Sequence, residues 1–375
     1  MSRLWFSSSR STFSCLPVTD DDVLPYLQAH LPDFTPTGDP AQLPDGNLNI
    51  VWRVPGTDRP VIVKYAPPYI AADPDTPLDP SRLDIEARCL NALDSGQLAT
   101  LTSAHVRTPR LLAATQDPHV ILMEDLGDLP TLDRWLRGSD ACSVEATAPI
   151  LGQHLGTFIG RLHATTHNCP EYAETFDNRP MQETRLAVQY RGVAEMLKMG
   201  GVDDAEALGA RAEALGDALL ETGECLTMGD LWPSSVLVQE KGLRLIDWEL
   251  AHYGRPLQDV AHLRAHLWMQ AHQAPSAAVA DAMASLWDAF LTAYRDALGE
   301  ADSTLWTDQE KRDAAVHFGA EILVRAVGPF QDGYVYAGLP PGHPAVQEAL
   351  SKAARTLRSP NAFELRIDSL PTGNH

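Results

Sequence analysis

The sequence predicts an α+β fold of two lobes, in which a small antiparallel-sheet amino-terminal lobe precedes a larger, mainly helical carboxy-terminal lobe. The chain has 375 residues, more than a single hydrophobic core usually accommodates. Short β-rich runs separated by turn residues dominate the chain up to Leu126. From Thr131 onward, apolar residues recur mostly at the spacing of amphipathic helices. The predicted divisions are a tail at 1–18, the amino-terminal lobe at 19–127, the carboxy-terminal lobe at 128–358 and a second tail at 359–375.

The elements expected in the first lobe alternate between helix and strand. Thr19 can cap a helix whose first turn is acidic and whose apolar residues share one face. The runs 50–54 and 61–65 are β-rich and flank a polar turn, so they predict a hairpin. Apolar residues at helical spacing predict a helix over 81–95, and two more strands are expected on either side of residues 117–118.

Long helical patterns fill most of the second lobe. They cover residues 148–167, 203–223, 257–273, 278–298 and 308–328. One stretch interrupts them, because the apolar runs at 236–238 and 243–246 lie on either side of a turn at 240–242. This stretch predicts a short hairpin within the helical lobe.

Composition and charge restrict the classes of partner. Hydrophobic residues make up 44% of the chain, yet no stretch reaches the roughly eighteen uninterrupted apolar residues that a membrane span needs. The formal net charge of -21 repels nucleic-acid backbones and anionic lipids, although an acidic surface also serves solubility alone. We therefore expect neither a nucleic acid nor a membrane as partner.

The cysteines indicate a reducing compartment. Their count is odd and no pair has CxxC spacing, which argues against a zinc site and against a disulfide framework. We expect a cytoplasmic protein on this ground. The first sixteen residues contain arginines, many serines and no acid, and we interpret them as a disordered tail rather than as a targeting segment.

Two aspartates flank the predicted hairpin of the second lobe. Asp230 lies in a "GDLWPSS" loop, and Asp247 follows the apolar run "LRLI", where a carboxylate is too closely flanked by core residues to be idle surface. Glu249 is two residues further on, so in a strand it would point to the same side as Asp247. Magnesium suits such oxygens, and Ser235 offers a neutral oxygen as a further ligand, or is simply a turn hydroxyl.

The first lobe supplies a cation and a turn. Lys64 lies in the apolar strand "VIVKYA", so a buried anion must compensate its charge, and Glu86 on the next predicted helix can do so. Gly46 and Asn47 form either a simple hairpin turn or a loop that covers phosphates. A phosphate-covering turn, a lysine held by a carboxylate, a metal carboxylate and a second carboxylate near a hydroxyl are the parts that phosphoryl transfer requires. The sequence thus predicts an ATP- and magnesium-dependent transferase.

These motifs resemble those of the aminoglycoside phosphotransferase and choline kinase superfamily. The stretches "DGNLNIVWRV", "VIVKYAPPYI", "SRLDIEARCL" and "GDLWPSSVLV…LIDWELAHYG" are most similar to its methylthioribose kinase branch and to the related fungal hydroxytryptamine kinase. The resemblance implies a two-lobed, protein-kinase-like fold. It covers roughly residues 20 to 330.

The resemblance also implies roles for individual residues. Asp230 matches the catalytic base, Asp247 matches the magnesium aspartate, and Glu249 matches the acid beside it. Lys64 and Glu86 match the pair that orients the nucleotide. Met123, Glu124 and Leu126 match the connector that binds adenine, and Asp259 matches an acid that supports the catalytic loop.

Two positions depart from the family pattern. Met228 replaces the usual histidine before Gly-Asp, so apolar packing takes the place of a hydrogen bond. Ser235 replaces the usual metal asparagine, as is frequent in methylthioribose kinases. Arg325 and Trp232 are candidate substrate residues, and each also fits an ordinary structural position.

The expected activity is therefore phosphorylation of a hydroxyl on a small metabolite, either a methylthioribose-like sugar or a hydroxylated aromatic amine. A catalytically silent, kinase-like binding protein is the alternative, favoured by the departures at Met228 and Ser235. The sequence leaves a homodimer open.

Overall fold

The computed structural model describes residues 18–44, 47–139 and 141–363. The chain divides into two compact units, which we call the small unit and the large unit. The small unit comprises the chain up to Thr102 together with Arg107–Leu129 and Asp247–Leu250. The large unit comprises Ser103–Val106, Pro130–Ile246 and the chain from Ala251 onward. Residues 1–17 of the predicted tail at 1–18 and residues 364–375 of the tail at 359–375 lie outside the described residues.

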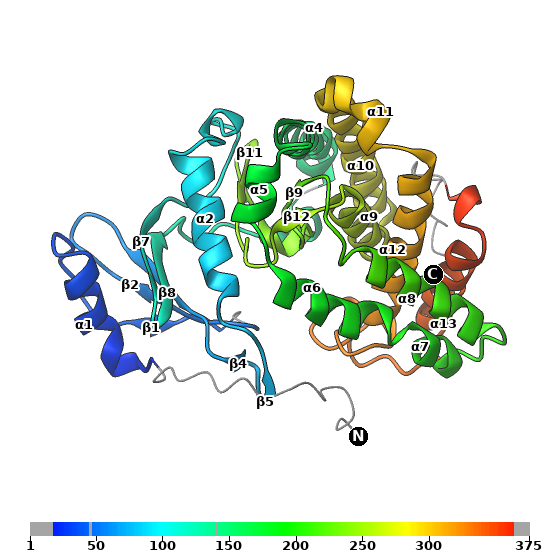
Figure 1. The fold of residues 1–375 in the computed structure, drawn as a ribbon, viewed down its shortest axis with the longest axis horizontal. Coiled ribbons are helices and arrows are strands. Elements are labelled where there is room, and N and C mark those ends of the chain that lie inside the picture. Colours follow the sequence, from blue (N-terminus) through cyan, green and yellow to red (C-terminus); the bar gives the residue numbers. More distant parts are fainter. Residues whose placement is uncertain (1–17, 45–46, 140, 364–375) are drawn as a thin grey trace. The chain divides into compact units, whose positions relative to one another are not determined.

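The small unit is built on an antiparallel sheet of five strands, ordered β1-β2-β3-β8-β7 (Figure 1). The strands are β1 (Ala41–Gln42), β2 (Ile50–Val54), β3 (Val61–Tyr65), β7 (Leu111–Gln116) and β8 (His119–Glu124). Both hairpins predicted from the sequence, β2 with β3 and β7 with β8, are present in antiparallel register. A separate antiparallel pair, β4 (Tyr69–Ile70) and β5 (Asp73–Pro77), lies between β3 and α2 in the sequence.

Helices cover this sheet on both faces. Alternate residues of β3, including Val63 and Tyr65, join a core with Val23 and Leu27 of α1 (Asp20–His30). Because side chains alternate along a strand, Lys64 points to the opposite face, where α2 (Arg82–Asp94) packs against β7 and β8. A short helix, η1 (Ala99–Leu101), follows α2.

The large unit is mainly helical. Its helices are α3 (Leu132–Gly138), α4 (Ala141–Thr166), α5 (Pro170–Thr175), α6 (Arg179–Arg185), a π-helix (Leu186–Tyr190), α7 (Val193–Met199), α8 (Ala205–Ala218), α9 (Leu257–His272), α10 (Ala277–Leu298), α11 (Asp302–Leu305), α12 (Asp308–Ala326) and α13 (Pro344–Arg358). Short 3₁₀ turns lie at Pro233–Ser235, Gly299–Ala301 and Pro360–Ala362. All five helical patterns predicted from the sequence are helices, and the additions are α13 and the shorter α3, α5, α6, α7 and α11.

The predicted hairpin of the large unit is also present. Strands β10 (Val236–Gln239) and β11 (Gly242–Leu245) pair antiparallel, and Glu240 takes a left-handed φ of 54° in the turn. A second antiparallel pair, β9 (Cys225–Thr227) with β12 (His252–Gly254), brackets this hairpin in the sequence. The remaining short strand is β6 (Val106–Arg107).

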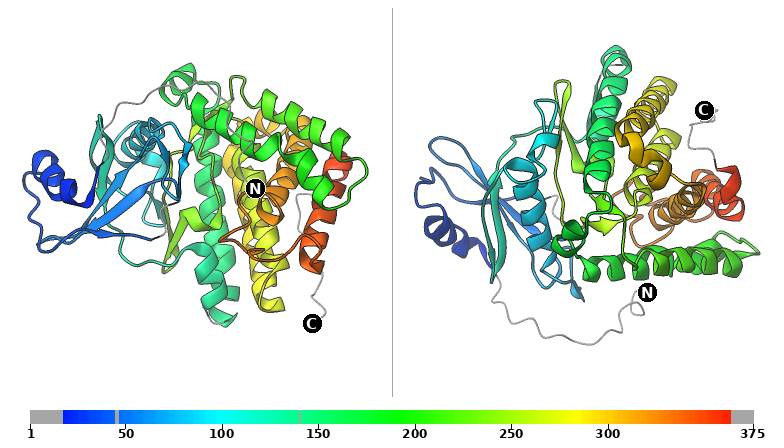
Figure 2. Two further views of the ribbon diagram at one scale, coloured as in Figure 1. Left: turned by 90° about the horizontal axis from the view of Figure 1, so that it is seen from below. Right: turned by 45° about the horizontal axis from the view of Figure 1, so that its top comes forward.

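Helices α4 and α10 lie side by side in parallel (Figure 2). Glycines at every fourth residue of α4 make this approach possible: a Cβ at Gly152 would lie 2.1 Å from the carbonyl oxygen of Leu286, and one at Gly156 would lie 2.2 Å from that of Phe290. No side chain larger than hydrogen fits between these backbones. A separate core gathers apolar residues of α7, α8, α9, α12 and α13.

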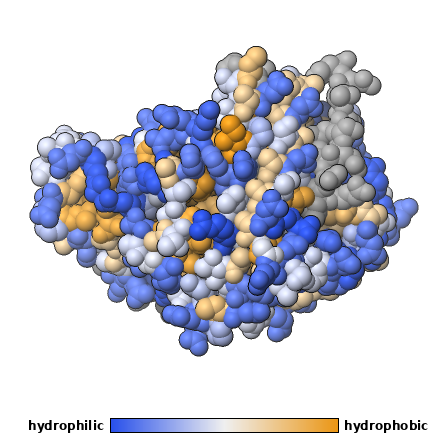
Figure 3. All heavy atoms as spheres, turned by 90° about the horizontal axis from the view of Figure 1, so that it is seen from above, coloured by the Kyte–Doolittle hydropathy of each residue, from blue (hydrophilic) through white to orange (hydrophobic). Residues whose placement is uncertain are grey.

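The surface agrees with the charge of the chain. Figure 3 shows a face on which hydrophilic side chains predominate and apolar ones form small separate patches. Among the described residues, the large apolar side chains that are exposed are Met199 and Phe330. The described part of the chain contains no helix that combines the length and apolar character a membrane crossing requires.

Candidate active site

A buried lysine with two carboxylate partners lies at the centre of the small unit. Lys64 Nζ donates to Glu86 Oε2 at 2.7 Å and to Asp247 Oδ1 at 2.9 Å. The pairing of Lys64 with Glu86 is the one that the apolar strand around Lys64 predicted. The Asp247 contact adds a residue from a distant part of the sequence, and the side chain of Asp247 remains 47% exposed.

The electrostatics of this cluster keep the lysine charged. Burial opposes a charge on Lys64, but the nearby carboxylates, with Asp247 first, outweigh it and raise the pKa of Lys64 above its usual value. Burial also raises the pKa of Glu86 to about 7, against the opposing effect of the ammonium group. We assign Lys64 as an ammonium, because it faces more than one carboxylate at ion-pair distance.

The expectation that Asp247 and Glu249 lie in a strand is wrong, although both carboxylates do face Lys64 Nζ, at 2.9 and 3.8 Å. Strand β11 ends at Leu245, and Asp247 has a φ of 62°, a left-handed backbone that ends the alternation of an extended strand. The side chain of Glu249 is only 6% exposed, and its carboxylate accepts hydrogen bonds from Asn49 Nδ2 and Arg82 Nε. Glu249 therefore anchors its segment, and its environment does not favour a role as metal ligand.

The other nucleotide-site candidates are described in part. Gly46 lies outside the described residues, whereas Asn47 is exposed and its carbonyl oxygen accepts from the amide of Ala72 at 3.0 Å. Met123 and Glu124 end strand β8, with Met123 paired to Ile62 of β3. The Glu124 side chain accepts hydrogen bonds from Arg107 at 2.8 and 3.1 Å, and Leu126 lies two residues beyond the end of the strand.

In the large unit, the carboxylate of Asp259 holds the loop that carries Asp230 through hydrogen bonds to its backbone. The two carboxylate oxygens of Asp259 accept from the backbone amides of Met228 and Gly229, each at 2.8 Å. Gly229 has a φ of 81°, which favours glycine. The Met228 side chain is fully buried, so the loop position usually held by histidine is packed in apolar surroundings, as the sequence indicated.

Ser235 closes the same loop. Its hydroxyl lies 3.0 Å from the carbonyl oxygen of Asp230 and 2.9 Å from that of Trp232, and the residue is fully buried. The hydroxyl hydrogen is thus used within the loop. This environment favours a role in loop geometry over a role as exposed metal ligand.

Asp230 itself has two neighbours that the sequence did not identify. Its Oδ1 lies 3.2 Å from Arg185 Nη2 and 3.1 Å from His262 Nε2, the latter contact being bent away from ideal hydrogen-bond alignment. Burial tends to raise the pKa of Asp230, but these neighbours and the more distant charge of Arg325 lower it to about 2. Asp230 is therefore a carboxylate at neutral pH.

The two candidate substrate residues contact each other. The guanidinium carbon of Arg325 lies 4.8 Å from the ring centre of Trp232, and the rings of Phe330 and Tyr334 lie at 5.2 and 5.3 Å. Arg325 Nε also donates to Glu321 Oε1 at 2.9 Å. Arg325 is therefore held in a fixed position by aromatic rings and by one carboxylate.

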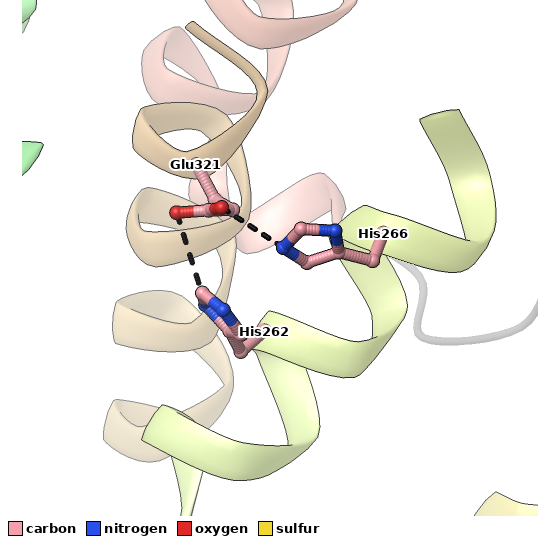
Figure 4. Close-up of side chains that lie close together, drawn as sticks. All are labelled: His262, His266 and Glu321. Carbon is pink, nitrogen blue, oxygen red and sulfur yellow. Dashed lines mark hydrogen bonds and ion pairs between the residues drawn. The ribbon is translucent and has the colours of Figure 1, made fainter. Parts of the chain in front are cut away.

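Glu321 lies beside two histidines of α9, as Figure 4 shows. One atom of each of His262, His266 and Glu321 falls within 4.8 Å of the others, a spacing that a metal ion could use. The carboxylate, however, already accepts from His266 Nε2, Gln189 Nε2 and Arg325 Nε, each at 2.9 Å. A cation would face the guanidinium of Arg325, so we interpret the cluster as a hydrogen-bond network.

Known phosphotransferases and small-molecule kinases resemble this chain. The family model described as "Phosphotransferase enzyme family" matches residues 39–307. A 4-hydroxytryptamine kinase of Psilocybe cyanescens is 28% identical over 262 residues, which cover 65% of this chain and 71% of that protein. A methylthioribose kinase of Exiguobacterium sibiricum is 24% identical over 328 residues, covering 76% and 79% of the two chains.

The solved structures include a choline kinase from Cryptosporidium parvum with a TM-score of 0.52 and 10% identity, covering 90% of this chain and 95% of that one. This likeness confirms the predicted two-lobed, protein-kinase-like α+β fold. Because the family model spans well over half of the sequence, the chain belongs to the phosphotransferase enzyme family.

Proposed function

We propose that this phosphotransferase moves the γ-phosphoryl group of ATP to a hydroxyl group of a small metabolite, with magnesium as the metal. The observation that carries the proposal is the pairing of buried Lys64 with Glu86 and with the half-exposed Asp247 in one compact unit. Burying a charged lysine with its carboxylate partners costs free energy that their attraction offsets only in part. A function in phosphate binding is a reason for the chain to keep it.

The small unit supplies the nucleotide chemistry in this proposal. Lys64 would contact the phosphates, and Glu86 would hold the ammonium group in place. Asp247 would hold magnesium, because its carboxylate is the exposed one of the cluster and hard cations prefer such oxygens. The bound metal would neutralise charge on the phosphates.

Asp230 would accept and orient the acceptor hydroxyl. Arg185 and His262 both approach Oδ1, so Oδ2 is the oxygen that we assign to the hydroxyl. With a pKa of about 2, Asp230 is a weak base that is always ionised near neutral pH. Such a group suits a loose transition state, in which the proton is transferred late and positioning matters most.

The acceptor is proposed from the relatives. The kinases of 4-hydroxytryptamine and of methylthioribose suggest a hydroxylated aromatic amine and a thiosugar as the first two compounds to test. A cytoplasmic location and a homodimer stay predictions from the sequence.

The test is magnesium-dependent turnover of ATP with a panel of hydroxylated metabolites, followed by mass-spectrometric detection of phosphorylated products. Asp230→Asn should lower kcat by at least about 100-fold, the usual contribution of a positioned acid or base. Asp281→Asn, at an exposed site on α10, is the matched control and should leave kcat unchanged. ATP binding with no product from any acceptor would instead support the alternative, a silent kinase-like binding protein.

A further inference from the structure

Three buried side chains form a chain of contacts that ends on Asp230. Tyr190 Oη lies 2.7 Å from His317 Nδ1, and His317 Nε2 lies 3.2 Å from His262 Nδ1. His262 Nε2 then lies 3.1 Å from Asp230 Oδ1, a close contact bent away from hydrogen-bond alignment, and no hydrogen-bond partner for this nitrogen is found among the described residues. Tyr190, His317 and His262 are each at most 1% exposed. Water therefore does not compete for these groups.

The hydroxyl of Tyr190 can only be the donor in its contact with His317. Burial raises the pKa of Tyr190 far above its usual value, so the phenol keeps its hydrogen. Within the described part of the chain, His317 Nδ1 is the hydrogen-bond partner of that hydroxyl. If His317 donated instead, the phenol hydrogen would be buried without an acceptor, which is unfavourable. Tyr190 is therefore the donor.

The positions of the ring hydrogens of His317 and His262 follow from this assignment of Tyr190 as donor. Burial lowers the pKa of His317 well below its usual value, so the ring is neutral and carries its hydrogen on Nε2. His317 Nε2 then donates to His262 Nδ1, which must be an acceptor. Glu321 Oε2 does not change this assignment, because it lies 3.8 Å from His262 Nδ1 and accepts from Gln189. The hydrogen of His262 is thus on Nε2, facing Asp230.

We propose that His262 is a positioning residue for the catalytic carboxylate, and that Tyr190 and His317 fix its tautomer so that an N–H always faces Asp230 Oδ1. This inference rests on the proposed role of Asp230. In this arrangement Oδ1 is fixed by His262 and Arg185, which turns Oδ2 to the acceptor. His262 Nε2 already carries a hydrogen, so it cannot take a proton from Asp230, and the chain orients the carboxylate without relaying protons.

The large unit repeats the same pairing elsewhere. Tyr334 Oη lies 2.6 Å from His266 Nδ1, and Tyr336 Oη lies 2.8 Å from His272 Nδ1. The His272 ring continues to Glu348 Oε2 at 2.8 Å, a carboxylate with a 65% exposed side chain. Tyr336 therefore provides a control with the same chemistry, since its chain ends on a surface residue and not on Asp230.

The direct test is the ¹⁵N NMR spectrum of histidine-labelled protein, in which the two ring nitrogens report the tautomer. We expect both His317 and His262 to be neutral with hydrogen on Nε2, and His262→Gln assigns the His262 signals. Hydrogen on His317 Nδ1, or a doubly protonated His262, would overturn the inference. This readout needs no substrate, so it is independent of whether the proposed kinase reaction is found.

Kinetics of matched variants test the positioning role. His262→Leu should lower kcat by about tenfold or more with little change in the KM for ATP, whereas His262→Gln keeps an N–H donor and should retain most of the activity. Tyr190→Phe removes one oxygen that does not touch Asp230, yet it should lower kcat several-fold and shift the His317 signals. Tyr336→Phe should change neither kcat nor the His317 signals. Equal activity of Tyr190→Phe, His262→Leu and the unmodified protein would contradict the proposal, and Tyr190→Phe serves alone if His262→Leu does not fold.

Discussion

Arg82 Nε lies 3.0 Å from Glu249 Oε2 in a fully buried ion pair that joins the start of helix α2 to the segment carrying Asp247. The same guanidinium donates to the carbonyl oxygens of Asp79 at 2.7 Å and of Leu48 at 2.9 Å. With a further acceptor at the carbonyl oxygen of Pro67, its donors are distributed over four separate stretches of the small unit. The position of Asp247 depends on this anchor, because Glu249 follows it by two residues.

Loss of Arg82 should destabilise the small unit strongly. Arg82→Met leaves the buried Glu249 carboxylate with only the more distant ammonium group of Lys64, at 3.8 Å, and we expect the free energy of unfolding to fall by about 3–5 kcal/mol. Urea denaturation measures this change, with Lys311→Met at an exposed ion pair as a control that should cost less than about 1 kcal/mol. The double variant Arg82→Met, Glu249→Gln should recover part of the loss. If it recovers none, the two side chains do not act as a pair.

Substitution of Lys64 should separate catalysis from folding. Lys64→Met should lower kcat/KM for ATP by about 100-fold or more, because it removes the charge assigned to the phosphates. It should also lower stability, since Glu86 is left buried beside a neutral side chain. Lys64→Met with Glu86→Gln should regain stability while remaining inactive. Activity in this double variant would argue against the nucleotide role of Lys64.

The close approach of α4 to α10 predicts that a glycine-to-alanine substitution in α4 lowers stability. In most helix interiors Gly→Ala is stabilising by about 0.5–1 kcal/mol. At Gly156 the new Cβ would lie 2.2 Å from the backbone oxygen of Phe290, so Gly156→Ala should be destabilising by about 1–3 kcal/mol or more. Gly138→Ala, at the end of α3 where no atom lies within 4 Å of a Cβ, should be neutral or slightly stabilising. Thermal or urea unfolding of the two variants provides the comparison.

Acid should destabilise the large unit through its neutral histidines. Burial lowers the pKa of His266 to about 3, whereas the unfolded chain titrates this residue near 6.5. Between these values the unfolded state binds more protons, so the free energy of unfolding falls as the pH drops below 6.5, by up to about 1.4 kcal/mol per pH unit for one such group.

The matching variant for this pH effect is His266→Gln. Its free energy of unfolding between pH 6 and pH 4 should depend less steeply on pH than that of the unmodified protein. His30→Gln, at an exposed position near the end of α1, should leave the slope unchanged. An identical slope in all three proteins would show that His266 is not neutral in the folded state.

Local patterns in the sequence predicted most of the fold and the pairing of Lys64 with Glu86. Lys64 was identifiable because an ammonium group in an apolar strand requires an anion, and the next amphipathic helix presented Glu86. The long helices follow from apolar periodicity. Helix α13 was not predicted, although Pro344 in its first turn and apolar residues from Val346 to Leu357 mark it in retrospect.

The surroundings of Asp230 could not be predicted in the same way. Arg185 and His262 lie 45 and 32 residues from it in the sequence, and they come from helices whose patterns report only which face is buried. Arg185 also immediately precedes a π-helix, which changes the register of side chains and has no simple sequence signal. The strand geometry assumed for Asp247 was wrong because a single left-handed residue ends the alternation.

The tyrosine–histidine pairs set the direction of hydrogen bonds in the interior of the large unit. In the pairs of Tyr190 with His317 and of Tyr334 with His266, burial keeps the imidazole ring neutral, so the ring accepts a hydrogen bond at one nitrogen and donates one at the other without adding net charge. The hydroxyl contributes little volume, but it selects which end of the ring bears hydrogen. Substitution by phenylalanine at such a site would leave the packing nearly intact and would remove the contact that selects which ring nitrogen bears the hydrogen.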